Sequence, residues 1–242
     1  GTFGRVFLAE HSYDKGGPGV AIKVAQLSSY SNTGKREARV SMALYGCSHV
    51  LGAAWAQVID DTLYVVMPFV PGSQELGDHL TPDTPLAARY KLMQNLADGL
   101  SSMHAQNILH MDIKPANCLV DGKGELHLAD FGCSGTPEEL PSKAVGTLLF
   151  MAPEVLFEEP PTTKADVYSF GLVAYNILTG ETLDQRNTQM SRCMREGLTE
   201  TEVSVLESKG VDEDVIAMIN TCLQKDPKAR THNMKAINLF IK

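Results

Sequence analysis

The feature that most constrains this chain is HMDIKPANCLVDGKGELHLADFG, residues 110–132, where polar groups alternate with short apolar runs. Residues 118–120 and 126–128 are apolar at most positions and predict two short strands. Asp121-Gly122 between them has the composition of a turn. The stretch therefore predicts a small hairpin with polar residues on both sides of it.

That hairpin folds back, so residues before and after it can meet. Asp112 and Asn117 precede it and Asp130 follows it, and we expect these three side chains to converge. Two carboxylates and a carboxamide suit Mg²⁺, which keeps waters and shares its ligands with phosphates. Lys114 adds positive charge where a phosphoryl group would develop negative charge. The alternative is a loop whose Asp and Asn side chains only cap its own backbone.

Charge and cysteine usage exclude several classes of protein. The net charge is −8 and no run of lysines or arginines occurs, which argues against nucleic-acid binding. The five cysteines are scattered and odd in number, which predicts neither a disulfide framework nor a zinc site. We expect a reducing, intracellular and cytoplasmic location, with a nuclear one left open. The most apolar stretch, residues 167–178, is too short to span a bilayer and predicts a buried helix without membrane contact.

The order of predicted elements is a small sheet-rich part followed by a larger helical part. Pro71-Gly72-Ser73 separates them, so we expect an N-terminal unit of residues 1–70 and a C-terminal unit of residues 71–242. The predicted elements are strands within 1–10 and 19–26, a helix over 35–44, a hairpin over 55–70 bending at Asp60-Asp61, a helix over 86–104, and mostly helices beyond 153, ending with 215–223 and 234–240.

The central stretch resembles a known catalytic motif. HMDIKPANCLV is similar to the catalytic loop H-R-D-x-K-x-x-N of eukaryotic-type serine/threonine protein kinases, and DFG at 130–132 matches the motif that follows it in that family. The resemblance implies that Asp112 orients the substrate hydroxyl, that Lys114 lies beside the γ-phosphate of ATP, and that Asn117 and Asp130 hold Mg²⁺.

The resemblance extends upstream. GTFGRV is similar to the second half of a glycine-rich loop, and VAIK to the strand whose lysine contacts the α- and β-phosphates. Taken alone, the glycines could mark only a turn or bulge. The residues implied to bind ATP are Gly1, Gly4, Val6, Ala21, Lys23, Glu37, Met67, Pro68, Val70 and Leu119, with adenine beside the 67–70 segment, Val6 and Ala21 above it and Leu119 below.

A phosphate-contacting lysine needs a carboxylate to orient it. Between Lys23 and Asp60 the sequence contains one acidic residue, Glu37, within a predicted helix. We therefore expect a Lys23–Glu37 ion pair. The alternative is that Glu37 is a helix-surface charge beside Lys35 and Arg36.

Four further segments are similar to supporting parts of the kinase fold. MAPE at 151–154 resembles A-P-E, and the resemblance implies a pair between Glu154 and Arg230. Asp166 in ADVYSFG resembles the aspartate of the central buried helix, although Tyr168 stands where kinases usually have Trp. Thr147 resembles the threonine that contacts the catalytic aspartate and lysine. Together they imply an α+β, bilobal kinase fold with an antiparallel-sheet N-lobe and a helical C-lobe.

The catalytic loop departs from the pattern at Met111, which replaces the arginine of H-R-D. That arginine normally binds a phosphate on the activation segment, so we expect constitutive competence or control by a protein partner. Lys143 is the alternative cation for such a phosphate. Cys133 is either a reactive thiol or a small buried residue, and DFGCS with a short segment is faintly similar to the Mos-like kinases.

The expected function is therefore transfer of the γ-phosphoryl group of ATP, with Mg²⁺, to serine or threonine hydroxyls of protein substrates. One alternative is a pseudokinase that binds or scaffolds on the same fold. Lys23, Asp112 and Asp130 are all present, which disfavours it. A small-molecule kinase is disfavoured by the A-P-E segment, which resembles a platform for protein substrates.

Overall fold

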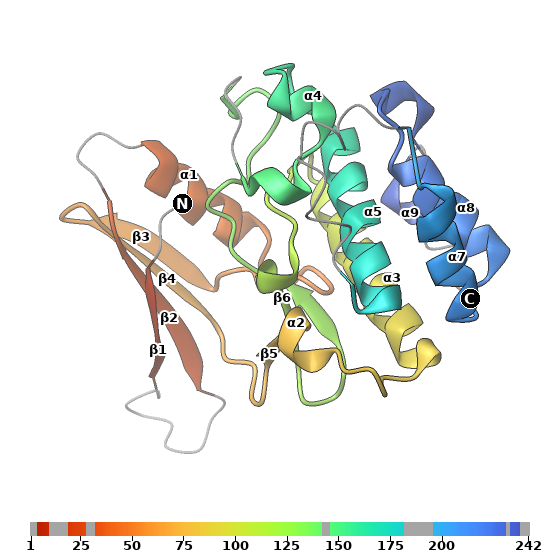
Figure 1. The fold of residues 1–242 in the computed structure, drawn as a ribbon. Helices are drawn as coiled ribbons and strands as arrows, with labels where there is room; N and C mark the ends of the chain where they lie inside the picture. The colour runs from red at the N-terminus through yellow and green to blue at the C-terminus, as the bar shows by residue number, and fades with distance from the viewer. Residues whose placement is uncertain are drawn as a thin grey trace.

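The computed structural model describes residues 4–9, 19–27, 32–141, 146–181, 196–230 and 233–237. Its first part is a four-stranded antiparallel sheet in the order β1-β2-β4-β3, shown at the left of Figure 1. The strands are β1 (Arg5–Ala9), β2 (Val20–Gln26), β3 (Trp55–Ile59) and β4 (Thr62–Pro68). Of the residues named in the sequence predictions, Gly1 and Lys143 lie outside the described residues.

The β3–β4 hairpin forms as the sequence predicts. Asp60 and Asp61 have φ values of 45° and 57°, so both turn residues are left-handed. A two-residue turn of this kind matches the twist of antiparallel strands, and Asp tolerates positive φ better than most residues. The turn fixes the β3–β4 register, in which Ile59 faces Thr62. β4 pairs in turn with β2, where Val65 faces Lys23. The hairpin thus positions the strand that bears Lys23.

Helix α1 (Asn32–Ala43) packs against β3 and β4 and lies beside the sheet in Figure 1. It starts three residues before the predicted range and buries Glu37, Ala38 and Val40 on one face. A small apolar core between α1 and the sheet includes Ala38, Leu63 and Val65. Glu37 is therefore on the inward face of this helix, so its interpretation as a helix-surface charge is wrong.

The rest of the chain is mainly helical. A second, three-stranded sheet has the order β5-β6-β7, and β6 and β7 form the hairpin that the sequence predicts. The elements are β5 (Gln74–Glu75), α2 (Leu76–His79), α3 (Leu86–His104), η1 (Pro115–Asn117), β6 (Cys118–Val120), β7 (Leu126–Leu128), η2 (Leu148–Phe150), α4 (Pro153–Leu156), α5 (Thr163–Thr179), α7 (Glu200–Ser208), α8 (Glu213–Cys222), η3 (Pro227–Ala229) and α9 (Met234–Ile237).

Helix α5 is the centre of this part. It begins where the Thr162 side chain accepts the Lys164 N–H and ends at Gly180, whose φ of 76° stops the helix. Nearly every residue between is buried, because α3, α7 and α8 pack around it. Figure 1 shows α5 among these helices on the side of the molecule away from the first sheet. The prediction of a buried core helix here is confirmed.

The architecture is α+β, with an antiparallel sheet at the N-terminal end and a larger helical body after it. The main apolar core lies in the helical body and extends to Val40 and Leu44 at the end of α1. Among the described residues, no helix combines the length and apolarity that a bilayer span requires.

Candidate active site

A cavity of about 330 Å³ lies where the first sheet meets the helical body. Its wall is formed by ten of the predicted residues, which come from β1, β2, β4, the segment after β4 and the β6–β7 region. These are Gly4, Val6, Ala21, Lys23, Met67, Pro68, Val70, Asn117, Leu119 and Asp130. Its volume is within the range of small-molecule sites.

Lys23 is the charged centre of the cavity wall. Its Nζ donates to Glu37 Oε1 and to Asp130 Oδ1, both at 2.7 Å. Lys23 is 9% exposed and Glu37 1% exposed, so this ion pair is sheltered from water. Burial alone would lower the pKa of Lys23, but the carboxylates of Glu37 and Asp130 raise it above the ordinary value. The predicted Lys23–Glu37 pair is confirmed, and Lys23 is cationic at neutral pH.

Gly4 lines the cavity where the chain passes close to β2. A Cβ at this position would lie 2.6 Å from Val24 O and 2.9 Å from Ala25 Cβ, so a side chain cannot be accommodated without movement of β2. The glycine therefore allows β1 to run close over the strand that bears Lys23.

Asp112 lies beside the cavity, not in its wall, and accepts hydrogen bonds from three residues. Lys114 Nζ donates to Oδ2 at 2.8 Å, Asn117 Nδ2 donates to Oδ2 at 3.0 Å, and Thr147 N donates to Oδ1 at 2.7 Å. Burial alone would raise the pKa of Asp112, but the hydrogen bonds from Lys114 and Thr147 hold it below its ordinary value. The carboxylate is therefore ionised and fixed in orientation.

Thr147 connects this cluster to the segment before A-P-E. Its Oγ1 accepts a hydrogen bond from Lys114 Nζ at 2.7 Å, so the lysine bridges Asp112 and Thr147. Gly146 has a φ of 106°, and a Cβ there would lie 2.3 Å from Met111 O. Only glycine allows the segment to approach the catalytic loop this closely. The predicted contacts of Thr147 are confirmed.

Asn117 and Asp130 fit a magnesium site. The Nδ2 of Asn117 donates to Asp112, which turns its Oδ1 away, and this oxygen has no partner among the described residues. The side chain of Asp130 is 47% exposed, and only its Oδ1 is engaged by Lys23. The described residues contain no group of three or more His, Cys, Asp or Glu that could hold a metal. Two oxygens suit an ion that completes its shell with phosphates and water.

The catalytic loop is held in place by Asp166 of α5. Its carboxylate accepts the N–H groups of His110 at 2.8 Å and Met111 at 2.9 Å, and it contacts His104 Nε2 at 2.8 Å. Met111 has a φ of 66°, a strained value for a methionine. Asp166 stabilises this backbone, which directs the next residue, Asp112, toward Lys114.

The A-P-E segment is anchored as the sequence predicts. Arg230 Nη1 and Nη2 donate to Glu154 Oε1 and Oε2 at 2.6 and 2.8 Å, and the guanidinium lies 4.9 Å from the Tyr168 ring centroid. Both ends of the pair are buried. Tyr168, which replaces the usual Trp, therefore packs on the arginine of this pair.

The surroundings of Cys133 and Ser134 decide whether their side chains can react. Burial, with the nearby carboxylates of Asp112 and Asp130, raises the pKa of Cys133 to about 11, so its thiol is protonated at neutral pH. Ser134 is fully buried and donates to His110 O at 2.9 Å. The Ser134 hydroxyl is thus shielded from solvent, and the Cys133 thiol, which is partly exposed, is not ionised.

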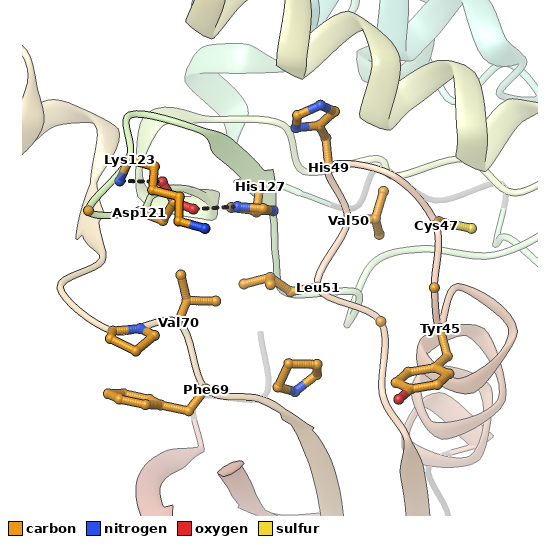
Figure 2. A pocket seen from close by; sticks show the side chains of 15 residues that line it. Tyr45, Cys47, His49, Val50, Leu51, Phe69, Val70, Asp121, Lys123 and His127 are labelled. Carbon is orange, nitrogen blue, oxygen red and sulfur yellow. Dashed lines mark hydrogen bonds and ion pairs between the residues drawn. The ribbon is translucent and has the colours of Figure 1, made fainter. Parts of the chain in front are cut away.

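A second cavity, of about 720 Å³, lies on the other side of the segment that follows β4 (Figure 2). Leu51, Pro68, Phe69 and Val70 line both cavities. This cavity is the larger, but the Asp121 carboxylate in its wall is already held by neighbouring residues. Figure 2 shows Asp121 between His127 Nε2, at 3.4 Å, and the Lys123 backbone N–H, at 2.8 Å. The cluster of Lys23, Glu37 and Asp130 lies at the smaller cavity, which is therefore the candidate site.

Sequence reasoning missed part of the first cavity's lining. Leu51, Phe69, Ser73, Ala116 and Ala129 also line it. Leu51 follows the isolated bridge between Val50 and Leu128, a contact between distant segments. No local pattern in the sequence signals such a contact.

An antiparallel sheet over a helical body, a lysine paired with a helix glutamate, and an aspartate–lysine–asparagine loop together define a protein kinase domain. Residues 1–239 match the family described as "Protein kinase domain", and the chain belongs to this family. It is 32% identical to the serine/threonine-protein kinase mos of Patiria pectinifera over 202 residues, which are 75% of this chain and 55% of that protein.

Other relatives are similarly distant. The serine/threonine-protein kinase PkaB of Streptomyces coelicolor is 31% identical over 248 residues, which are 95% of this chain and 57% of that protein. Aurora kinase C of Mus musculus is 31% identical over 194 residues, 75% of this chain and 67% of that protein. The chain thus spans little more than half the length of the first two. The faint resemblance to Mos-like kinases agrees with the match to the mos kinase, at 32% identity. The bacterial kinase PkaB is almost as similar, at 31%.

Proposed function

We propose that this domain is an active kinase that transfers the γ-phosphoryl group of ATP to serine or threonine hydroxyls of protein substrates. The observation that carries the proposal is the position of Lys23 Nζ, 2.7 Å from both Glu37 and Asp130 at the cavity wall. This arrangement places a fixed ammonium group beside a partly exposed carboxylate, as binding of a metal-bound triphosphate requires.

The nucleotide is proposed to enter the first cavity with adenine between Val6 and Ala21 on one side and Leu119 on the other. Met67, Pro68 and Val70 would line the adenine edge, where backbone groups can recognise it. The chain near Gly4, together with Gly1, would cover the phosphates, and Lys23 would contact the α- and β-phosphates. Apolar walls with few polar groups are typical of such sites.

Asn117 and Asp130 are the proposed ligands of Mg²⁺, which when bound neutralises charge on the phosphates. Asp112 would orient the acceptor hydroxyl and receive its proton, because its carboxylate is ionised and held by three donors. Lys114, bound to Asp112 and Thr147, would face the transferred group with positive charge. The domain's contribution is thus positioning and electrostatics.

The pseudokinase alternative is disfavoured because Lys23, Asp112 and Asp130 are all present. Lys23 contacts Asp130 at the cavity wall, and Asp112 is held beside the cavity by Lys114, Asn117 and Thr147. We also propose that the domain divides into an N-lobe of residues 1–70 and a C-lobe of residues 71–242. The separate sheet and the small core under it support this division.

The same proposal covers environment and partners. A reducing, intracellular compartment is supported by the described cysteines Cys47, Cys118, Cys133 and Cys222, which are free thiols. We also propose control by a protein partner for the full-length protein; one relative, from Arabidopsis thaliana, is a CBL-interacting serine/threonine-protein kinase.

The test is phosphotransfer by the purified domain to a peptide library containing Ser, Thr or Tyr acceptors, with Asp112→Asn as the diagnostic variant. We expect transfer to Ser and Thr and a loss of at least about a hundredfold in kcat, with ATP affinity retained, because a positioned base contributes roughly 10²–10⁴. Asp83→Asn, an exposed carboxylate before α3, is the matched control. Equal rates for Asp112→Asn and wild type, or ATP affinity lost with the rate, would contradict this role.

A further inference from the structure

Helix α1 is bound to the segment after DFG by two arginines. Arg36 donates from Nη1 to Glu139 O at 3.2 Å and from Nη2 to Gly132 O at 3.5 Å. Arg39, one turn further along the same face, forms an ion pair with the Glu139 carboxylate. The two arginines therefore hold both the backbone and the side chain of Glu139.

The segment that they hold is ordered by its own contacts. Glu139 Oε2 accepts the Thr136 N–H at 3.2 Å, which closes a turn in front of Arg39. Gly135 and Leu109 exchange two backbone hydrogen bonds, of 2.9 and 3.1 Å, and so attach the segment to the chain leading into the catalytic loop. A continuous set of hydrogen bonds thus links α1, the segment and the catalytic loop.

The same helix turn carries Glu37, which is adjacent to Arg36 and paired with Lys23. Any rotation or outward shift of α1 that separates Glu37 from Lys23 must also break the contacts of Arg36 and Arg39. The segment is therefore coupled mechanically to the ion pair at the cavity wall.

The contacts that hold the segment involve no residue that needs to be phosphorylated. Met111 cannot bind a phosphate, and Ser134 is buried and bonded to His110 O. Glu139 supplies a permanent negative charge to which the arginines of α1 bind. We propose that Arg36, Arg39 and Glu139 form a phosphate-independent latch that positions α1 and so keeps the Lys23–Glu37 pair assembled. This proposal rests on the function proposed above and adds its regulation.

The three residues contribute unequally. The side chains of Arg39 and Glu139 are 48% and 40% exposed, and a pair this exposed is weak and screened by salt. Arg36 is only partly exposed and donates to two backbone carbonyl groups. A backbone carbonyl cannot change rotamer, as the Glu139 side chain can. Loss of Arg36 should therefore matter more than loss of Arg39, whereas charge reversal at position 39 adds repulsion.

The first experiment tests the contacts of Arg36 with the segment by amide exchange and involves no measurement of activity. Backbone amide exchange of residues 133–140 is followed in phosphatase-treated protein for wild type, Arg36→Ala and Lys35→Ala. Lys35 is exposed on the same helix, so Lys35→Ala removes one positive charge, as Arg36→Ala does. We expect faster exchange at Gly135 and Leu140 in Arg36→Ala only. Exchange unchanged in Arg36→Ala, or changed equally in Lys35→Ala, would overturn the latch.

The second experiment is a charge swap read by kcat, because recovery in the double variant shows that the two charges act on each other. Dephosphorylated wild type should keep its activity, and Arg39→Glu and Glu139→Arg should each lower kcat about fivefold to tenfold, within the range of weak surface pairs plus repulsion. The double variant should return to within about twofold of wild type. Glu138→Arg, at the exposed neighbouring position, should have no effect.

The two experiments separate the failures. Wild type that transfers no phosphoryl group defeats the proposed function, while amide exchange still decides whether the latch exists. Active wild type with a double variant no better than either single variant defeats the latch alone. A large loss of wild-type activity on phosphatase treatment also defeats it, because the segment would then depend on phosphate.

Discussion

Asp112 accepts hydrogen bonds from a lysine two residues away, an asparagine five residues away and a backbone N–H thirty-five residues away. These donors compensate for its burial and lower its pKa. Their contribution to stability is therefore present above the ordinary range of a carboxylate and is lost only as the pH falls through the lowered value. At neutral pH the site holds a carboxylate whose orientation is set by two neighbouring side chains and one distant backbone N–H.

Thr147 is predicted to act through its hydroxyl. Thr147→Val removes the acceptor of Lys114 Nζ while the backbone N–H to Asp112 stays, so kcat should fall on the order of tenfold. Thr147→Ser keeps the hydroxyl and should stay within about threefold of wild type. Steady-state kinetics at saturating ATP check this. Equal losses in both variants would show that the hydroxyl is not what matters.

Asp130 is predicted to act through Mg²⁺. In Asp130→Asn the charge that binds the ion and Lys23 is lost, so the activity should fall and the Mg²⁺ concentration for half-maximal rate should rise. Part of the loss should be recovered at high Mg²⁺. Titration of Mg²⁺ at fixed ATP measures this, with Asp83→Asn as the control. A variant with the same Mg²⁺ dependence as wild type would remove Asp130 from the metal site.

At the scale of elements, the site depends on the meeting of β2 and α1. β2 carries Lys23, and its neighbours β1 and β4 fix the position of that strand in the sheet. α1 brings Glu37 to the lysine from the other side, and both groups are buried. Neither element can place its charge without the other, because an unpaired buried charge is strongly unfavourable.

The Lys23–Glu37 pair should therefore behave as one unit in a double-mutant cycle. Lys23→Ala and Glu37→Ala should each lower kcat/KM severely, and the double variant should lose much less than the product of the two factors. Substitution of Lys35, which is on the same helix but exposed, serves as the uncoupled control. Losses that simply multiply would mean that the two residues act independently.

At the scale of the whole molecule, the helical body is stabilised by the Arg230–Glu154 ion pair, whose residues do not line the first cavity. Arg230 is almost completely buried and donates to Glu154 as well as to the carbonyl groups of Lys164, Gln224 and Lys225. One side chain thus joins α4, the start of α5 and the chain around η3. The segment that carries Thr147 leads directly into α4. The Arg230–Glu154 pair therefore also restrains the position of Thr147.

Removing Arg230 should destabilise the domain more than removing Glu154. Arg230→Met leaves a buried carboxylate and three carbonyl groups without their donor, so the free energy of unfolding should fall by about 3–5 kcal/mol. Glu154→Gln keeps one acceptor and should cost about 1.5–3 kcal/mol. Urea unfolding measures both, with Lys228→Ala as an exposed control. A smaller effect for Arg230→Met than for Glu154→Gln would contradict this order.

The sequence by itself determined the elements and most of the site. The two-residue turn at Asp60-Asp61, the helix of residues 86–104 and the β6–β7 hairpin follow from local residue preferences, and the structure has all three. Lys23 and Glu37 were also identifiable, since the catalytic motifs imply the lysine and the chain offers one acidic partner nearby. Information of this kind lies in short segments, where neighbouring residues dictate backbone conformation.

Only the tertiary structure decided which distant groups share a partner. Lys23 divides its Nζ between Glu37 and Asp130, which is 107 positions away, and Arg36 and Arg39 meet Glu139 about as far along the chain. Burial of Ser134 and the raised pKa of the partly exposed Cys133 also depend on packing. These contacts form because packing of the sheet, α1 and the helical body brings distant segments within hydrogen-bond distance, and no local pattern encodes that distance.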